Sequence, residues 1–246
     1  MNISFAIVNR RAFIKLAGAA TTAVMAGGLP TRAASPSSTN IGIIGSGNVG
    51  SALGRSWVNS GHEVMFSSRN MDHDKALAAE LGERARAGTP REAAVFGEVV
   101  LIAVPYGALP GLGKSLKDVL EGKIVIDACN PFPSRDGEIA NWAREKGAGL
   151  ASAELLSGAR IVRAFNAIGA ARMGAARESP GKTGMPIAGD DAEAIAVASR
   201  LIRDIGYEPV LIGGLGMGKY LLPGTLLAGE HTPDEIREIA GKLKPL

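Results

Sequence analysis

The sequence predicts a single α/β domain of the doubly wound type, with a mainly parallel sheet and a short helical tail. From residue 40 onward, short apolar runs alternate with amphipathic stretches of helical period, which is typical of a sheet covered on both faces. The 246 residues are 46% apolar and include 33 glycines, which suits a well-buried core with many tight turns. The tail from 213 to 246 is too short for an independent helical domain.

The alternation predicts the elements in order along the chain. Strands are expected at 41–44, 63–67, 99–103, 124–127 and 160–164, with a short, weakly marked strand near 84–87. Helices are expected at 48–60, 71–81 and 89–96, with a further one that begins near Leu109. After a loop around 179–184, marked by Pro180 and Gly181, we expect a strand at 185–188, a helix at 192–205 and a strand at 208–212. One or two helices are expected in the tail.

The first 34 residues have the three parts of an export signal. Arg10, Arg11 and Lys15 form a basic region, an uncharged run covers 16–29, and small residues follow at 33–34. Because that run is shorter and richer in alanine and glycine than the ~20 strongly apolar residues that span a bilayer, we expect cleavage and no permanent membrane anchor.

The arginine pair, with Phe13 and Lys15 after it, resembles a twin-arginine (Tat) signal peptide over 1–34. An ordinary Sec signal is the alternative. The expected product is a linker at 35–39 and a mature domain at 40–246, delivered by the Tat translocase to the periplasm or another extracytoplasmic compartment. Tat carries folded proteins, which suits one that acquires a cytoplasmic cofactor before export.

Charge and cysteine content exclude several classes of partner and site. The net charge of +3 comes from the leader, which has four basic residues and no acidic one. The rest of the chain has 23 basic and 24 acidic side chains. We therefore expect no nucleic-acid partner. Cys129 is the only cysteine, which excludes a disulfide framework and a cysteine-rich metal site. No histidine or carboxylate pair has metal-ligand spacing, so no metal site is predicted.

Three glycines follow the first predicted strand in the pattern Gly-x-Gly-x-x-Gly. Gly45 permits a tight turn, Gly47 lets the backbone approach a pyrophosphate, and Gly50 lets the helix pack closely on the strand. The phosphates would lie at the positive end of the helix. The motif predicts a Rossmann-type dinucleotide site formed by Gly45, Ser46, Gly47, Asn48, Val49 and Gly50, and a purely structural glycine turn is the alternative.

The end of the second predicted strand indicates which dinucleotide binds. An NAD site usually has Asp or Glu there, whereas this chain has Ser68 and Arg69. A hydroxyl and a guanidinium suit a 2′-phosphate, which a carboxylate would repel, so we expect NADP(H) to be preferred. His73 and Lys75 lie within reach of the same phosphate, although an exposed helical face explains both equally well.

Several segments, taken together, resemble a known family. The segments 45–50, 68–69, 103–106, 127–131, 163–168 and 189–191 occur in an order that resembles the NADPH-dependent reductases of the deazaflavin coenzyme F-420. The same module is similar to the reductase domain of the STEAP metalloreductases and, more distantly, to pyrroline-5-carboxylate reductase. The likeness covers roughly 40–225 and implies direct hydride transfer between NADP(H) and a planar acceptor, without specifying which acceptor.

The resemblance also implies roles for individual residues. Ser68 and Arg69 would hold the 2′-phosphate, and Val104 and Pro105 would line the adenosine side. The floor beneath the nicotinamide would be formed by Ala164, Asn166, Ala167 and Ile168. Asn166 and Ala167 depart from the Asn-Thr or His-Thr pair of many relatives, and the tail around 222–224 has no clear match. Acceptor binding is therefore left open.

Candidates for catalysis are few, because hydride transfer needs orientation and exclusion of water more than an acid or base. Asn130 and Asn166 lie at predicted strand ends, where a carboxamide can bond the nicotinamide amide or the acceptor. Cys129 is expected to be a small buried hydrophobe, with a redox role as the alternative. Tyr106 either covers the cofactor or packs.

The two remaining histidines of the mature domain have structural explanations. His62 lies just before the second predicted strand, where a turn or strand-edge role is expected. His231 precedes Thr232, which is expected to cap a helix, so His231 is placed on the surface.

The leading hypothesis is an NADPH-dependent oxidoreductase acting on a small-molecule electron acceptor: coenzyme F-420, a flavin, a quinone or a ferric complex. An imine, β-hydroxyacid or pyrroline-5-carboxylate type reductase ranks lower, because those enzymes carry a long helical dimerisation domain for which the tail leaves no room. A non-catalytic NADP-binding sensor or escort module is the third hypothesis. A homodimer stays open.

Overall fold

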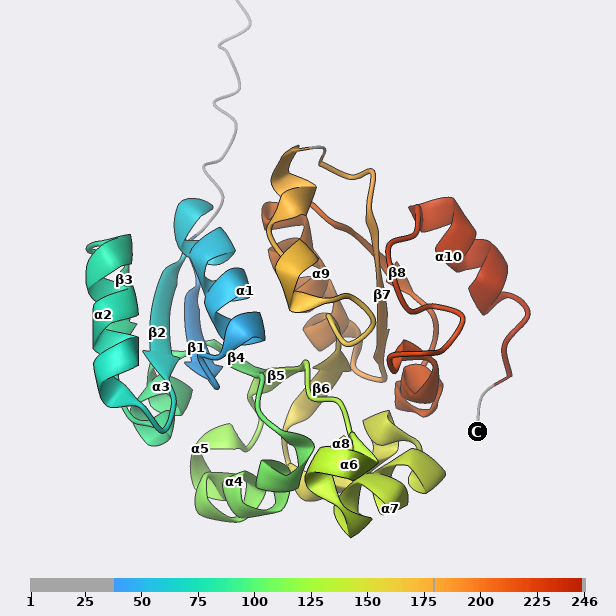
Figure 1. Cartoon of the computed structure of the whole chain (residues 1–246), viewed down its shortest axis with the longest axis horizontal. Helices are drawn as coiled ribbons and strands as arrows, with labels where there is room; N and C mark the ends of the chain where they lie inside the picture. The colour runs from blue at the N-terminus through green and yellow to red at the C-terminus, as the bar shows by residue number, and fades with distance from the viewer. Residues whose placement is uncertain (1–37, 179, 245–246) are drawn as a thin grey trace, which may run out of the picture. The chain divides into compact units, whose positions relative to one another are not determined.

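The computed structural model describes residues 38–178 and 180–244, which form a twisted eight-stranded sheet with helices on both faces (Figure 1). The predicted signal peptide and residues 35–37 of the predicted linker lie outside the described residues. The strands are β1 (Asn40–Ile44), β2 (Glu63–Ser67), β3 (Ala85–Ala87), β4 (Val99–Ile102), β5 (Ile124–Asp127), β6 (Arg160–Arg163), β7 (Gly184–Gly189) and β8 (Glu208–Leu211). The main helices are α1 (Asn48–Asn59), α2 (Met71–Leu81), α3 (Pro90–Phe96), α4 (Leu109–Ser115), α5 (Lys117–Leu120), α6 (Pro133–Asp136), α7 (Glu138–Lys146), α8 (Ala148–Leu155), α9 (Ala192–Asp204) and α10 (Pro233–Ala240). Short 3-10 helices are η1 (Tyr106–Ala108), η2 (Ala170–Arg172), η3 (Ala175–Glu178) and η4 (Leu215–Leu221).

The strand order, β3-β2-β1-β4-β5-β6-β7-β8, confirms the predicted doubly wound, mainly parallel sheet. β1 pairs with both β2 and β4, so the order reverses direction there. In open α/β sheets, ligands bind outside the carboxyl ends of the strands at such a reversal. The fold therefore places the predicted glycine loop, which follows β1, at the expected ligand edge.

Alternating side chains of the central strands enter two separate cores. Ile41 and Ile43 of β1 pack with α1, α2 and α9, whereas Ile44 packs with α3, α4, α5, α7 and α8 on the opposite face. Because both faces are covered, β4 is buried at every position and its sequence is a continuous apolar run. This explains why apolar runs, and not strict alternation, mark these strands.

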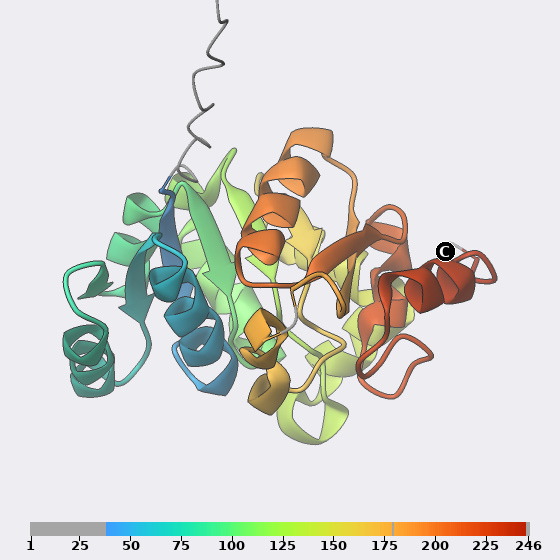
Figure 2. The ribbon, with the colours of Figure 1, turned by 90° about the horizontal axis from the view of Figure 1, so that it is seen from above.

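The last two strands were predicted, but not their direction. β7 runs antiparallel to β6, and β8 is parallel to β7. Of the residues described between β6 and β7, only two short 3-10 helices are regular. A parallel neighbour is usually reached through a crossover that contains an α-helix, and the described residues of this segment contain none. The chain therefore turns back after β6, and Figure 2 shows the last strands and α10 at the far end of the molecule from α2.

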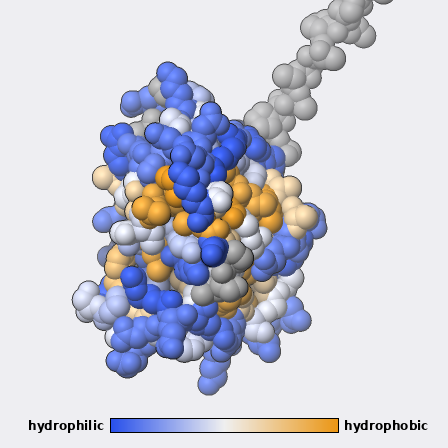
Figure 3. Space-filling model, turned by 90° about the vertical axis from the view of Figure 1, so that its right-hand side faces the viewer, coloured by the Kyte–Doolittle hydropathy of each residue, from blue (hydrophilic) through white to orange (hydrophobic). Residues whose placement is uncertain are grey.

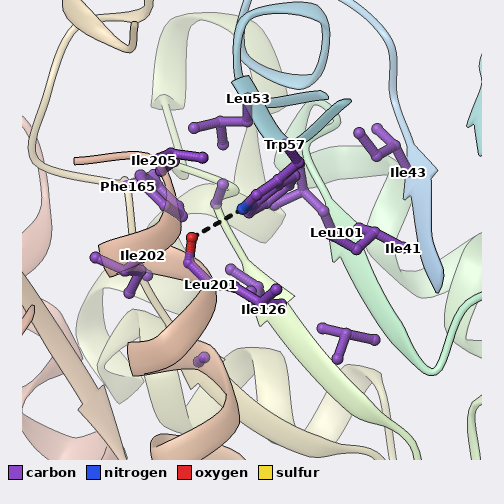
Figure 4. Packing of buried hydrophobic residues seen from close by; sticks show 14 of the residues in the cluster. Ile41, Ile43, Leu53, Trp57, Leu101, Ile126, Phe165, Leu201, Ile202 and Ile205 are labelled. Carbon is purple, nitrogen blue, oxygen red and sulfur yellow. Dashed lines mark hydrogen bonds between the residues drawn. The ribbon is translucent and has the colours of Figure 1, made fainter. Parts of the chain in front are cut away.

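Trp57 links α1, which follows the first strand, to α9, which precedes the last strand. Its indole lies fully buried in α1, and its Nε1–H donates to the backbone oxygen of Leu201 in α9 at 2.9 Å (Figure 4). The ring of Phe165 meets Trp57 edge-on and also meets Tyr207 edge-on, each at 6.2 Å between centroids. These contacts fix the segment after β6, which carries several predicted site residues, against α1.

The carboxyl-terminal tail packs on β7 and β8 through its own apolar cluster, which includes Met217, Leu221 and Ile236. Thr232 caps α10 in a capping box with Glu235, as its sequence predicts. Figure 3 faces this side of the molecule and shows apolar side chains between hydrophilic ones. None of the described helices is long and apolar enough to cross a membrane.

His62 is a structural residue at the end of the sheet away from the glycine loop. Its ring is 1% exposed, its Nδ1 accepts from the backbone N–H of Thr39 at 3.3 Å, and its Nε2 lies 3.2 Å from Asp204. Burial lowers the pKa of His62, against the opposing effect of the Asp204 charge. His62 therefore holds the start of β1 to α9, in agreement with the strand-edge role expected for it.

Candidate functional site

The glycine loop has the geometry that its three glycines predict. Gly45 has φ of 104°, and a Cβ there would lie 2.4 Å from the backbone oxygen of Ala103. A Cβ on Gly50 would lie 2.0 Å from the backbone oxygen of Gly45, so only glycine allows α1 to approach the loop this closely. Gly47, in contrast, has nothing within 4 Å of a built Cβ. Its open side is where a ligand can approach the backbone.

The amino terminus of α1 has the features of an anion-binding helix end. Its N-cap is Gly47, no side chain caps its first turn, and no acidic residue lies there. The helices α2, α3, α9 and α10 each have a capping side chain and an acidic residue in the first turn. The first N–H groups of α1 therefore keep their hydrogen-bonding capacity for a ligand, and the helix dipole favours a negative one.

Replacing Gly47 with alanine is expected to leave the fold intact and weaken dinucleotide binding. Open space around the built Cβ means that the free energy of unfolding should change by no more than about 0.5 kcal/mol. The methyl group would occupy the space through which a pyrophosphate approaches the backbone, so the affinity for NADP⁺ should fall at least tenfold, which is about 1.4 kcal/mol. Calorimetric titration with NADP⁺ measures this.

Gly111→Ala in α4 is the matched control, because its Cβ also has nothing within 4 Å and it lies outside the glycine loop. Equal affinities of the two variants for NADP⁺ would contradict the placement of the pyrophosphate.

Arg69 and Lys75 are exposed on the segment that follows β2. Gly45 and Ser46 donate their backbone N–H groups to the oxygen of Ser67, the last residue of β2, which brings the two loops together. Arg69 and Lys75 have no hydrogen-bond or ion-pair partner among the described residues, so both cations remain available for a phosphate. Their assignment to the 2′-phosphate stays a prediction.

Ser68 lies at the same place, but its hydroxyl faces inward. Its Oγ is 3.0 and 2.9 Å from the two carboxylate oxygens of Asp74, a residue of α2 that is fully buried. Sequence reasoning missed Asp74. The signal was its position, because Asp74 shares the buried face of α2 with Leu77 and Ala78, where a carboxylate is unexpected.

A crevice of about 190 Å³ opens at the carboxyl ends of β1, β4 and β5. It brings together predicted residues from three separate segments with two that the sequence analysis did not single out, Phe132 and Arg135. The crevice is lined by Asn48, Val49, Ala103, Val104, Pro105, Ala128, Asn130, Phe132 and Arg135. The end of the glycine loop and the candidate Asn130 therefore share one cavity, as the fold predicts for strand ends.

Asn130 and Asn166 form a linked pair at the ends of β5 and β6. The Nδ2 of Asn130 donates to the backbone oxygen of Asn166 at 2.8 Å, and the Nδ2 of Asn166 donates to the backbone oxygen of Cys129 at 3.1 Å. Both amide nitrogens are oriented by carbonyl partners. The two Oδ1 atoms are buried and have no partner among the described residues, which leaves two hydrogen-bond acceptors for a ligand.

The turn after β6 is strained. Phe165 has φ of 67°, although it is not a glycine, and its ring is buried between Trp57 and Tyr207. The packing of the ring holds this conformation, which directs Asn166 toward Asn130. Ala164 is fully buried and Asn166, Ala167 and Ile168 are at most 8% exposed, so the predicted floor lies beneath the surface.

A buried ion pair supports the asparagine pair from below. Arg163 and Asp127 are both fully buried, and the guanidinium binds the carboxylate directly. Arg163 also donates to the backbone oxygen of Cys129 at 3.1 Å, the atom that accepts from Asn166. Asp127 accepts from the backbone N–H of Cys129 at 2.8 Å. The pair thus fixes the backbone on which Asn166 depends.

Cys129 and Tyr106 are packing residues in this structure. Cys129 is 1% exposed, and burial raises the pKa of its thiol well above the ordinary value, with the Asp127 charge acting in the same direction. A buried, protonated thiol is unreactive, which favours the expected hydrophobic role. The Tyr106 hydroxyl is buried, 3.1 Å from the Ser152 hydroxyl, so this ring packs instead of covering a ligand.

His231 lies only partly at the surface, just before α10. The ring of His231 is partly buried and its Nε2 is enclosed without a partner among the described residues, so the surface position predicted for it is only half right. Its segment turns inward because its backbone oxygen accepts from Gly184 at the start of β7. Within 38–178 and 180–244, no three His, Cys, Asp or Glu side chains are grouped to hold a metal ion.

Comparison with known proteins identifies the relatives. Residues 40–131 match the family model described as "NADP oxidoreductase coenzyme F420-dependent". The chain is 32% identical over 189 residues to the F420-dependent NADP reductase of Methanothermobacter marburgensis, covering 70% of this chain and 82% of the relative. It is also 32% identical over 198 residues to Metalloreductase STEAP3 of Rattus norvegicus, covering 78% of this chain but only 38% of that protein.

Solved structures share the fold. A hypothetical protein of Sinorhizobium meliloti superposes with a TM-score of 0.67 at 26% identity, covering 78% of this chain and 93% of that one. An imine reductase of Myxococcus stipitatus superposes with a TM-score of 0.55 at 19% identity, covering 74% and 58% of the two chains, a likeness of fold alone. Since the match to the F420-dependent NADP reductase covers most of that relative, the chain belongs to the family of coenzyme F420-dependent NADP oxidoreductases, as its sequence predicted.

Proposed function

We propose that this NADP-dependent oxidoreductase transfers hydride between NADP(H) and a planar, flavin-like acceptor. The observation that carries the proposal is the crevice lined both by Asn48 and Val49, at the uncapped start of α1, and by Asn130, which donates a hydrogen bond to the backbone oxygen of Asn166. A site for phosphates and a site rich in amide acceptors thus lie at one sheet edge, as an extended dinucleotide requires.

The residues fit NADP(H) along its length. The first N–H groups of α1 would hold the pyrophosphate, Arg69 the 2′-phosphate, and Val104 and Pro105 the adenosine side. The unpartnered Oδ1 atoms of Asn130 and Asn166 would accept from the amide of the nicotinamide. NADPH supplies the hydride when bound, and the protein contributes orientation and exclusion of water.

Phe132 favours a flat acceptor. Phe132 is 38% exposed at the crevice, and the Arg135 guanidinium lies 5.0 Å from the centre of its ring. An exposed aromatic ring stacks on planar rings. The Arg135 guanidinium is already paired with the carboxylate of Asp136, so it adds no preference for a charge on the acceptor. Deazaflavins such as coenzyme F-420 and flavins both contain a flat ring system of this kind. Quinones and ferric complexes are the other acceptors to be tested.

The test is multiple turnover with a panel of acceptors. The purified mature domain is given NADPH labelled with deuterium at C4 together with coenzyme F-420, FMN, a soluble quinone or ferric citrate, and NADPH oxidation is followed by absorbance. We expect oxidation with at least one planar ring acceptor. With coenzyme F-420 the deuterium should be retained on a carbon of the reduced ring, whereas FMN and the quinone are judged by NADPH oxidation alone, because deuterium on nitrogen or oxygen exchanges with water. With NADPH below saturation, Gly47→Ala should slow the oxidation at least about tenfold. Tight NADPH binding without turnover on any acceptor would show instead a non-catalytic binding module.

We further propose export by the Tat pathway, supported by Arg10, Arg11, Phe13 and Lys15. The full chain, expressed in a bacterium with an intact Tat system, should appear in the periplasmic fraction in a shortened form. Replacing both arginines with lysine should retain it in the cytoplasm. Export of that variant at the normal level would contradict the proposal and favour the Sec pathway.

A further inference from the structure

The most unusual group near the proposed 2′-phosphate position is the carboxylate of Asp74. It is fully buried, and its partners are two hydroxyls, those of Ser46 in the glycine loop and of Ser68 after β2. No Lys, Arg or His forms an ion pair with Asp74 within 38–178 and 180–244. A buried carboxylate held only by hydroxyls is costly, which points to a role beyond packing.

The hydrogen bonds of the two serines are committed by this carboxylate. A hydroxyl has one hydrogen to donate, and each serine directs it to Asp74. The Ser68 Oγ also lies 3.2 Å from the backbone oxygen of Asn70, but a charged acceptor at 2.9 Å is the stronger partner. The same Oγ accepts from the backbone N–H of Asn70 at 3.0 Å.

A 2′-phosphate only accepts hydrogen bonds, so neither serine can donate to it while Asp74 holds their hydrogens. The carboxylate also places a negative charge one hydroxyl away from the place where the phosphate is expected, and the two charges repel each other. Arg69, which has no partner among the described residues, is left as the main source of phosphate recognition.

We infer that Asp74 is a specificity-determining residue that weakens the preference of this protein for NADP(H) over NAD(H). It does so by holding the hydroxyl of the partly exposed Ser68 away from the 2′-phosphate and by repelling that phosphate. The inference rests on the proposed placement of the phosphate beside Arg69. It differs from the role that family resemblance implies for Ser68, in which the serine holds the phosphate itself.

Asp74→Asn tests the inference, because the substitution keeps the shape and removes the charge. The carboxamide can donate one N–H to a serine oxygen and so release a hydroxyl hydrogen toward the ligand. We expect the Kd for NADP⁺ to fall about tenfold, the effect of one gained charge-assisted hydrogen bond, with the Kd for NAD⁺ within about twofold of the unaltered protein. Calorimetric titrations with both dinucleotides measure the ratio.

Two further variants separate the hydroxyl effect from simpler causes. Asp72→Asn removes the same charge from the same helix turn, but Asp72 is exposed, so it should change the ratio less than twofold. Ser68→Ala should leave the Kd for NADP⁺ within about twofold in the unaltered background and remove most of the gain in the Asp74→Asn background, a coupling that a structural role would not produce.

Several results would overturn the inference. Equal weakening of both dinucleotides by Asp74→Asn would show a purely structural carboxylate, and an equal gain from Asp72→Asn would show a long-range charge effect. If Asp74→Asn does not fold, a tenfold loss of NADP⁺ affinity in Ser68→Ala alone would show that the hydroxyl already holds the phosphate. An unaltered protein that binds neither dinucleotide would overturn the proposed function as well, whereas an unchanged ratio in a protein that binds NADP⁺ overturns this inference alone.

Discussion

Replacing Arg69 with aspartate is expected to reverse the dinucleotide preference. The affinity for NADP⁺ should fall at least about 100-fold, because the substitution removes a charge-assisted hydrogen bond and puts a like charge beside the 2′-phosphate. The affinity for NAD⁺ should rise or stay within about threefold, since a carboxylate at this position accepts from the ribose hydroxyls. Titration with each dinucleotide gives both constants.

The physical reason for so large an effect is that Arg69 has little assistance. Ser68 and Ser46 direct their hydroxyls toward Asp74, and the Nε2–H of His73 donates to the backbone oxygen of Ser46 at 3.1 Å. Within 68–75, Lys75 is the other cationic side chain that has no hydrogen-bond or ion-pair partner among the described residues. A single guanidinium therefore carries most of the discrimination between the two dinucleotides.

Arg237→Asp is the control for a general change of surface charge. Arg237 is exposed on α10 and pairs only with Asp234 of its own helix, so its replacement should leave both dinucleotide affinities unchanged. If Arg69→Asp reduces the affinities for NADP⁺ and NAD⁺ by the same factor, Arg69 shapes the loop and does not recognise the phosphate. Preference for NADP⁺ would then have to come from Lys75 or from backbone groups.

Apolar runs and helix caps predicted the strands and helices whose bounds depend on neighbouring residues alone. The bounds of β2, α2 and β5 agree with the prediction, and α2 begins after Asn70, whose side chain caps it. Between 131 and 158, in contrast, the short helices α6, α7 and α8 were not predicted. The buried residues of α8 are alanine, glycine and serine, which form no apolar stripe, so helical periodicity had nothing to detect there.

The candidate site also has one part that local sequence predicts and another that it does not. The glycine loop is predictable because its chemistry depends on three residues and one turn, all within 45–50. The ties from Asp74 to two separate loops, the left-handed conformation of Phe165 and the entry of Phe132 into the crevice all depend on tertiary packing. No local sequence pattern marks such features, because they arise from contacts between segments that are far apart in the sequence.

Breaking the buried ion pair beneath the asparagines is expected to have the largest effect on stability. Arg163→Met would leave the Asp127 carboxylate fully buried without its cation, and the free energy of unfolding should fall by about 3–5 kcal/mol. The backbone oxygen of Cys129 would also lose one of its two donors, and Asn166 would be held less firmly. Urea denaturation at neutral pH measures the change in stability.

The expected cost comes from the uncompensated charge, and two further variants test that cause. Removing both charges in Asp127→Asn/Arg163→Met should restore a large part of the lost stability, because asparagine can still accept from the N–H of Cys129. Arg172→Met breaks a solvent-screened, exposed pair with Glu230 and should cost far less stability than Arg163→Met. If Arg163→Met costs no more than Arg172→Met, the buried pair contributes only as an exposed pair does, and the backbone around Cys129 is held by the sheet alone.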